Sequence, residues 1–172
     1  MDKISIIIPA YNEEKLIGET LESLKDLTEI KEIIVVNDGS SDRTGEIARQ
    51  YKVKVVDLPQ NKGKGEAVQE GISQATSEII ALIDADLGNT AREVKKLITP
   101  VITNEADMTI ARFKGRAAGG GFGIIRKLSS FLIKLATNQD ISSPLSGQRV
   151  LKKEIVDNIG RLAGGFGLEF AL

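Results

Sequence analysis

The sequence predicts an α/β fold in which a mostly parallel β-sheet carries helices on both of its faces. Two observations lead to this fold class. Short, β-branched apolar segments alternate with segments of helical spacing four times before a fifth apolar segment, which is typical of a parallel sheet. The apolar segments are also hydrophobic on both sides, as expected of strands that are covered on both faces. In sheets of this kind, ligands bind beyond the carboxyl ends of the strands.

The expected elements follow from local signals along the chain. Pro9 is expected to end the first strand, and Asn12 to cap a helix with acidic residues in its first turn. Thr90 and Glu93 match the T-x-x-E capping box, which predicts a helix that begins near Thr90. Further helices are expected at 40–50 and after the loop that begins at residue 61. The strands are expected at residues 4–8, 32–38, 53–58, 78–84 and 106–112.

The pattern changes after residue 112. A basic, glycine-rich stretch (114–123) overlaps a segment of helical spacing at 122–136, and residues 143–156 predict a turn followed by a strand or a helix. The segment 122–136 is more simply a core-facing helix, although its basic flank would also suit a membrane surface. The chain ends inside an apolar pattern. We therefore expect a single domain, residues 1–172, that is truncated at its C-terminus.

Composition limits the chemistry that the chain can perform. Histidine and cysteine are both absent, which excludes the Ser-His-Asp triad, disulfides and the usual zinc sites. Any general base is then Asp or Glu, or less commonly Lys or Tyr. Any metal is held by oxygen ligands, which favours Mg²⁺, Mn²⁺ or Ca²⁺. Because 23 basic residues face 24 acidic ones, the net charge gives no basis for nucleic-acid binding.

The hydropathy pattern favours a cytoplasmic protein. The apolar run near the N-terminus turns polar too early for a signal peptide. No run approaches the roughly 20 apolar residues that a spanning helix needs. The hydrophobic share of 41% suits a globular core instead.

Two aspartates, Asp84 and Asp86, follow the apolar segment that predicts the fourth strand. On an extended chain their side chains point to the same side, where two like charges repel unless a cation lies between them. Mg²⁺ and Mn²⁺ commonly bind one or two carboxylates together with phosphate oxygens and water. Taken alone, such a pair is more often a turn, but the capping signal at Thr90 weakens that interpretation. Gly88 and Lys95 stand where an EF-hand loop needs ligands, which disfavours calcium.

Other positions carry weaker signals, each with an ordinary alternative. Asp38 follows the second strand and could accept hydrogen bonds from a base or a ribose, or simply form an Asp-Gly turn. Lys62 or Lys64 could neutralise phosphate, or lie in a solvated loop. Arg149 could bind phosphate through its guanidinium group, or be an ordinary surface residue. Glu169 could be a general base, or an acidic residue in the first turn of a helix.

Five sequence blocks together resemble a known family. The chain contains, in order, IIIPAYNEEKLIGETLESL, IIVVNDGSSDRTGEIA, NKGKGEAVQEGI and IIALIDADL. This set is similar to the inverting family 2 glycosyltransferases, whose GT-A fold has a Rossmann-like, mostly parallel sheet. A later block, SGQRVLKKEIV, resembles a segment of the polyprenol-phosphate (dolichol-phosphate) sugar synthase branch. The resemblance implies a nucleotide-sugar-binding part at 1–112 and an acceptor-side part at 113–172.

The resemblance also implies roles for individual residues. Asp86 would bind a Mg²⁺ or Mn²⁺ ion directly, and Asp84 would lie beside the ribose and the metal. Asp38 would hold the base, and Lys64 would approach the donor. Glu169 matches the acidic position of a late helix, where it would be the general base for a hydroxyl acceptor. The positions that would contact donor or acceptor are Pro9, Ala10, Tyr11, Glu13, Asp38, Lys64, Asp84, Ala85, Arg112 and Arg149.

The expected reaction is the metal-dependent transfer of a hexose from a UDP- or GDP-sugar to an acceptor, with inversion. The resemblance favours polyprenyl phosphate, at the cytoplasmic face of a membrane, as the acceptor. The alternatives are a retaining transfer of glucose to a small phosphorylated acid such as phosphoglycerate, a sugar-phosphate nucleotidyltransferase, and a nucleotide-sugar-binding domain without activity. A nucleotidyltransferase is expected to have a glycine-rich loop with arginine where this chain reads PAYNEE. The synthase branch often has a metal-contacting Gln at the position of Gly88.

Overall fold

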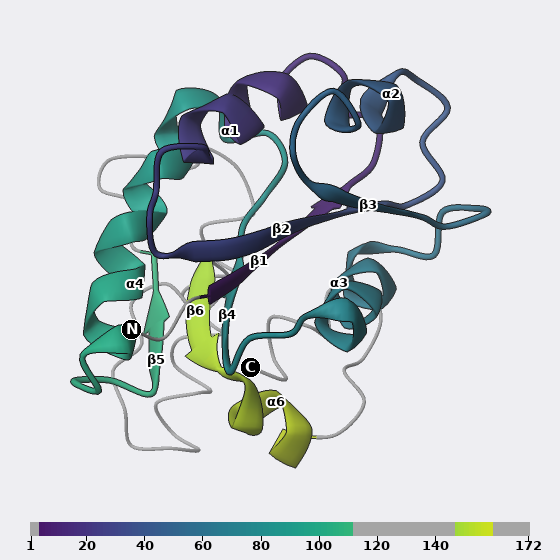
Figure 1. Cartoon of the computed structure of the whole chain (residues 1–172). Coiled ribbons are helices and arrows are strands. Elements are labelled where there is room, and N and C mark those ends of the chain that lie inside the picture. Colours follow the sequence, from purple (N-terminus) through teal and green to yellow (C-terminus); the bar gives the residue numbers. More distant parts are fainter. Residues whose placement is uncertain (1–3, 112–146, 160–172) are drawn as a thin grey trace, which may run out of the picture.

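A β-sheet lies at the centre of the protein, whose computed structural model describes residues 4–111 and 147–159. The strands in these residues are β1 (Ile4–Ala10), β2 (Ile30–Asn37), β3 (Lys54–Asp57), β4 (Ile79–Leu82), β5 (Met108–Ile110) and β6 (Arg149–Lys152). They form one sheet in the order β3-β2-β1-β4-β6-β5 (Figure 1). β1 to β4 run parallel, whereas β6 is antiparallel to both of its neighbours, β4 and β5. The mostly parallel sheet that the sequence predicts is thus confirmed.

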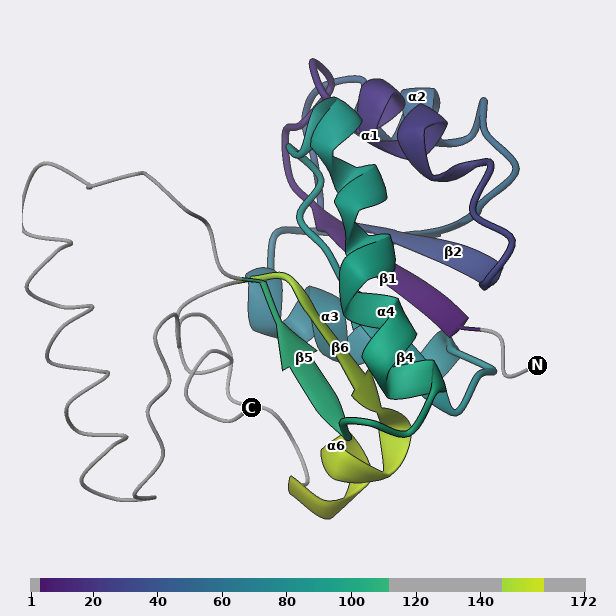
Figure 2. The ribbon, with the colours of Figure 1, turned by 90° about the vertical axis from the view of Figure 1, so that its left-hand side faces the viewer.

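Helices cover both faces of this sheet (Figure 2). One face packs against α1 (Ile17–Leu24), α2 (Thr44–Ala48), the 3-10 helix η1 (Gly88–Val94) and α4 (Lys95–Ile102). The other face packs against α3 (Lys64–Gln74) and α6 (Lys153–Ile159). The segment 143–156, where the sequence predicts a turn and then a strand or a helix, contributes to both β6 and α6.

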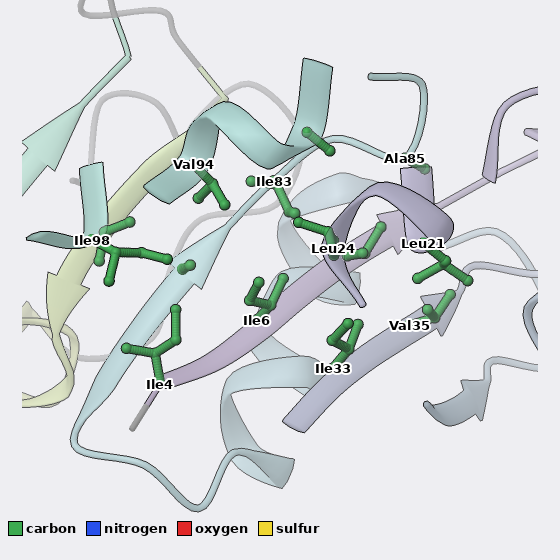
Figure 3. Packing of buried hydrophobic residues seen from close by; sticks show 14 of the residues in the cluster. Ile4, Ile6, Leu21, Leu24, Ile33, Val35, Ile83, Ala85, Val94 and Ile98 are labelled. Carbon is green, nitrogen blue, oxygen red and sulfur yellow. The ribbon is translucent and has the colours of Figure 1, made fainter. Parts of the chain in front are cut away.

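The core forms because consecutive residues of β1 point to opposite faces of the sheet. Ile6 and Ile8 belong to the buried cluster under α1 and α4, and Ile7 to the cluster under α3. Figure 3 shows Leu21 and Leu24 of α1 facing the strands of the first cluster. A strand that is buried on both faces reads as an unbroken apolar run, which is why the pattern predicts β1 so clearly.

The expected end of the first strand at Pro9 is wrong, because β1 continues through Pro9 to Ala10. Residues two apart in a strand face the same neighbouring strand. Ile7 faces β4, since its carbonyl accepts a hydrogen bond from the Ile83 amide at 3.1 Å. Pro9 faces the same side, but the pairing with β4 ends at Ile7. The missing N–H of Pro9 therefore costs the sheet no hydrogen bond.

The expected helix cap at Asn12 is also wrong. Asn12 has a φ of 55°, and α1 begins only at Ile17. The Oδ1 atom of Asn12 accepts a hydrogen bond from the Ser41 amide at 2.9 Å, and the Asn12 amide donates to Ser40 Oγ at 3.0 Å. The side chain thus ties the loop after β1 to the loop after β2, so it is not available to cap a helix.

The capping box at Thr90 does not form. η1 begins at Gly88, and Thr90 Oγ1 donates to the Leu87 carbonyl at 2.6 Å instead of accepting from a backbone amide. Glu93 forms an ion pair with Lys96 and does not reach back to Thr90. A tight 3-10 turn therefore precedes α4, which begins at Lys95.

Two further expectations concern the end of the chain and the membrane. The glycine-rich stretch and helix expected within 114–136 lie outside the described residues, and the division of the chain into two parts stays a prediction. Among the helices of the described ranges, none has the length and apolar character needed to cross a membrane.

Candidate functional site

An open cavity of about 440 Å³ lies at the carboxyl ends of β1, β2 and β4. This is the edge at which parallel sheets of this class bind ligands. The loops after the three strands and the start of α3 supply its walls. It is lined by Pro9, Ala10, Tyr11, Glu13, Asp38, Asn61, Gly63, Lys64, Ala67, Asp84, Ala85 and Asp86. Every site position between 9 and 86 that the family resemblance implies therefore lines one cavity, whereas Lys62, the alternative to Lys64, does not.

The loop after β1 presents an aromatic ring to this cavity. Tyr11 is 47% exposed, although Ala10 beside it is buried. The amide of Glu13 donates to Thr44 Oγ1 at 2.8 Å, which fixes the loop to the start of α2. An exposed ring on a fixed backbone is a suitable surface for stacking a planar base.

Asp38, at the end of β2, organises the loop before α3. Its side chain is buried, and its two oxygens accept hydrogen bonds from the amides of Lys62 at 2.8 Å and Gly63 at 2.9 Å. Gly39 follows with a φ of 67°, and a Cβ there would lie 2.4 Å from the backbone of Gln60. Asp38 is thus more than an ordinary turn residue. Each carboxylate oxygen keeps a second lone pair, so the expected contact with a base stays a prediction.

Asp84, just after β4, is held from two sides. Lys64 Nζ lies 2.7 Å from Asp84 Oδ1, and Gln148 Nε2 donates to Asp84 Oδ2 at 2.9 Å. Gly147 passes so close that a Cβ there would lie 2.7 Å from Lys64 Nζ and 2.8 Å from either carboxylate oxygen. The carboxylate is therefore oriented before any ligand binds, with a cation directly beside it.

Asp86 differs from Asp84 in its surroundings. β4 ends at Leu82 and a turn follows, so the two aspartates do not lie on one extended strand as the sequence argument assumes, although both line the cavity. Asp86 is exposed, and its carboxylate makes no hydrogen bond or ion pair with residues in 4–111 or 147–159.

Burial, together with the negative charges of Asp86, Asp42 and Asp84, raises the pKa of Glu13. Negative charge thus gathers on this side of the cavity.

The carboxylates fit a divalent cation that arrives with a phosphorylated ligand. No group of three or more acidic, histidine or cysteine side chains suited to a metal occurs in the described ranges. A metal cage made by this part of the protein alone is thus not present. Mg²⁺, by contrast, is commonly bound by one or two carboxylates, and phosphate and water complete its shell. Asp86, with Asp84 beside it, matches that donor set.

The remaining predicted residues lie elsewhere. Arg149 is only 2% exposed and pairs with Leu82 and Ile110 in the sheet. The alternative of an ordinary surface arginine is therefore wrong. Arg149 is also not among the residues that line the cavity, and its phosphate contact stays a prediction. Arg112 and Glu169 lie outside the described residues.

Sequence reasoning missed Gln148, Asn61 and Gly63. Gln148 contacts Asp84 across 64 positions of the chain, and only the pairing of β6 with β4 brings the two together. Asn61 and Gly63 line the cavity because the loop that contains them is held against Asp38 by hydrogen bonds. The glycine-rich NKGKG stretch was the available signal for that loop.

The fold and the site define an α/β protein with a cavity that is lined by carboxylates and a lysine at the carboxyl ends of its parallel strands, and the comparisons with known proteins identify its family. The chain belongs to glycosyl transferase family 2, whose model matches residues 5–164. It is 35% identical over 172 residues to a dolichol-phosphate mannosyltransferase of Pyrococcus furiosus. This match covers 91% of this chain and 48% of that protein. It is 37% identical over 106 residues to an undecaprenyl-phosphate 4-deoxy-4-formamido-L-arabinose transferase of Photorhabdus laumondii, covering 56% of this chain and 33% of that one.

The chain is also similar in fold to solved structures. Glucosyl-3-phosphoglycerate synthase of Mycobacterium tuberculosis, in complex with Mn²⁺, UDP-glucose and phosphoglyceric acid, matches with a TM-score of 0.81 at 28% identity. The match covers 98% of this chain and 62% of that chain. The chain spans about half the length of the curated relatives it matches, with 57% and 48% for the first two.

Proposed function

We propose that the protein transfers a hexose from a nucleotide-diphosphate sugar, with Mg²⁺ or Mn²⁺, to a polyprenyl phosphate, with inversion at the anomeric carbon. The observation that carries this proposal is the arrangement at one sheet edge. The exposed carboxylate of Asp86 and the ammonium group of Lys64 line the same cavity, in which Lys64 also pairs with Asp84. A diphosphate and its cation need this combination of charges.

The nucleotide is proposed to bind along the ends of β1 and β2. The base stacks on Tyr11, whose ring is exposed at the cavity. Asp38 reaches the base through its free lone pairs while it holds the loop before α3. Asp84, fixed by Lys64 and Gln148, accepts hydrogen bonds from the ribose hydroxyls. A UDP- or GDP-sugar satisfies each of these contacts.

The diphosphate is proposed to lie between Asp86 and Lys64. Asp86 and Asp84 would hold the cation, which acts as a Lewis acid on the phosphate oxygens. In the reaction, the bond between the anomeric carbon and the diphosphate oxygen breaks, and its electron pair leaves with the nucleoside diphosphate. A phosphate oxygen of the acceptor attacks from the opposite face and forms the new bond. Lys64 stabilises the negative charge that develops on the leaving group.

The acceptor is inferred from the relatives. Two of them are named for dolichol phosphate and undecaprenyl phosphate. A phosphate acceptor is already anionic, so it needs positioning rather than a general base. Arg112 and Arg149 are the proposed positioning cations, and Glu169 would be needed only for a hydroxyl acceptor. A lipid acceptor places the reaction at the cytoplasmic face of a membrane.

A second candidate is transfer of glucose to a phosphorylated small acid. It is favoured by the structural likeness to glucosyl-3-phosphoglycerate synthase, which extends over 98% of the chain. The two candidates differ in the solubility and in the anomeric configuration of the product. A labelled sugar that enters the organic phase with polyprenyl phosphate supports the lipid acceptor. A water-soluble product with the donor's anomeric configuration supports the second candidate.

The test of the donor site is calorimetry of UDP- and GDP-sugars, with and without Mn²⁺ or Mg²⁺. Wild-type protein is expected to bind one donor class in a metal-dependent way, and Asp86→Asn to bind it at least about tenfold more weakly, since a carboxylate ligand is lost. Asp26→Asn, the same change at an exposed position of the loop after α1, is the control and should match wild type. Equal donor and metal binding by Asp86→Asn and wild type would show that the site assignment is wrong.

A further inference from the structure

We propose that Thr20 of α1 is a positioning residue that clamps the turn carrying Asp86. Its side chain is 0% exposed. Thr20 Oγ1 donates a hydrogen bond to the Ala85 carbonyl at 2.8 Å and accepts one from the Gly88 amide, also at 2.8 Å. One hydroxyl can make both bonds, because it has one proton and two lone pairs. The two contacts enclose Asp86 from either side along the chain.

Neighbouring residues of α1 hold the same turn. Ser23 Oγ donates to the Thr20 carbonyl at 2.9 Å and also lies 3.3 Å from the Gly88 carbonyl, and Glu19 Oε1 accepts from the Asn89 amide at 3.2 Å. Ala85 belongs to the buried cluster that includes Leu21 of α1 (Figure 3). One face of α1 thus contacts the backbone before Asp86 at Ala85 and after Asp86 at Gly88 and Asn89.

Gly88 shows how closely the turn is fitted to the helix. Its φ is 52°, and a Cβ there would lie 3.1 to 3.3 Å from the carboxyl atoms of Glu19. A larger residue at this position would combine an unfavourable backbone conformation with a close contact. The backbone path after Asp86 is therefore set by α1.

This clamp matters because Asp86 is not held by its own side chain. Its carboxylate makes no hydrogen bond or ion pair within the described ranges, unlike the carboxylate of Asp84. The position of Asp86 therefore depends on its backbone. Loss of the Thr20 hydroxyl would leave a buried amide and a buried carbonyl without this partner, so the turn would relax and the carboxylate would move with it.

The inference rests on the proposed function in one respect only, which is that Asp86 binds the metal. Two measurements separate a failure of the clamp from a failure of the proposed function. Exchange of the Gly88 amide proton, followed by NMR, reports the clamp itself in the absence of ligand. Calorimetry of Mn²⁺ with UDP reports the consequence at the site. If wild type binds no Mn²⁺ with UDP, the proposed function fails, and amide exchange alone decides whether the clamp exists.

The matched variants are Thr20→Val, which has the same shape without the hydroxyl, and Thr20→Ser, which keeps the hydroxyl without the methyl. In Thr20→Val we expect the Gly88 amide proton to exchange roughly tenfold faster than in wild type. We also expect the affinity for Mn²⁺ with UDP to fall roughly tenfold. Both figures correspond to the free energy of one lost buried hydrogen bond. Thr20→Ser should restore both, although it loses the buried methyl and melts at a lower temperature. Thr99→Val, an exposed threonine on α4, is the control.

Three outcomes would overturn the proposal. Unchanged Gly88 exchange in Thr20→Val would show that the hydroxyl does not hold the turn. Wild-type affinity in Thr20→Val, or equal losses in the valine and serine variants, would reduce Thr20 to a core residue. If Thr20→Val does not fold, Gly88→Ala replaces it. This change strains the same turn within the turn itself, because Gly88 has a φ of 52° and an added Cβ would lie close to Glu19. Unchanged affinity of Gly88→Ala for Mn²⁺ with UDP would then contradict the clamp. Weaker binding at a temperature at which the variant is still fully folded would support it.

Discussion

The ammonium group of Lys64 lies 2.7 Å from Oδ1 of Asp84, which joins the first residue of α3 to the loop after β4. The side chains are 38% and 29% exposed, so solvent screens the pair and it adds little to folding stability. Its consequence is orientation. Asp84 is kept in place at the cavity by Lys64 and Gln148, and the ammonium group of Lys64 lies where we propose that the diphosphate binds.

Replacing Lys64 by Met is expected to weaken UDP binding by roughly tenfold or more, since a charge-assisted hydrogen bond to phosphate is lost. Binding of uridine, which has no phosphate, should fall less than that of UDP, since it loses only the part of the orientation of Asp84 that Lys64 supplies. The melting temperature should stay close to that of wild type, because the Lys64–Asp84 pair is partly exposed. Calorimetry with both ligands, at fixed Mn²⁺, makes the comparison.

The control for this prediction is Lys52→Met, which removes the same charge from an exposed position before β3. It should bind UDP as wild type does. The assignment of Lys64 to the diphosphate does not survive if UDP and uridine lose affinity equally, since that pattern would mean a general distortion of the nucleotide site.

The fold could be predicted from sequence because its signals are local. An apolar run such as β1, buried on both faces, and the regular spacing of α1 are visible without any partner. The capping prediction at Asn12 failed for the opposite reason. Asn12 binds Ser41 across 29 positions, and this non-local contact competes successfully with a local cap. Pro9 is tolerated in a central strand only because β4 ends beside it.

The site was predictable to the same extent. Residues at the ends of β1, β2 and β4 meet because parallel strands end at one edge, so Glu13, Asp38 and Asp84 could be brought together from pattern alone. Gln148 could not, since nothing local shows that β6 enters the sheet antiparallel beside β4. The clamp by Thr20 was hidden likewise, because its position on the helix reads as an ordinary core position.

Gly147→Ala is expected to impair the site while it leaves the fold intact. The added Cβ would lie 2.7 Å from Lys64 Nζ and 2.8 Å from both oxygens of Asp84, so the two side chains must move apart. Both are far ends of side chains, which can shift without disturbing the core. We predict weaker UDP binding at nearly unchanged stability, measured by calorimetry and thermal unfolding. Gly18→Ala, a glycine to alanine change within α1, is the control, and equal UDP affinity in both variants would contradict the crowding at Gly147.

Asp42 is expected to make folding stability depend on acidic pH. Burial alone would raise its pKa, but hydrogen bonds from the Thr44 side chain, from the Thr44 amide and from the Glu14 amide outweigh burial and hold the pKa below its ordinary value. A carboxyl group with a lowered pKa in the folded state stabilises the protein above its unfolded pKa of about 4, and this contribution is lost as the pH falls through the folded value. Wild type should therefore melt at a higher temperature than Asp42→Asn near neutral pH, and the difference should shrink as the pH is lowered from about 4 towards 2. Thermal unfolding of both proteins across this range is the measurement. A difference between wild type and Asp42→Asn that does not change with pH would show that the charge of the Asp42 carboxylate has no part in joining the loops after β1 and β2.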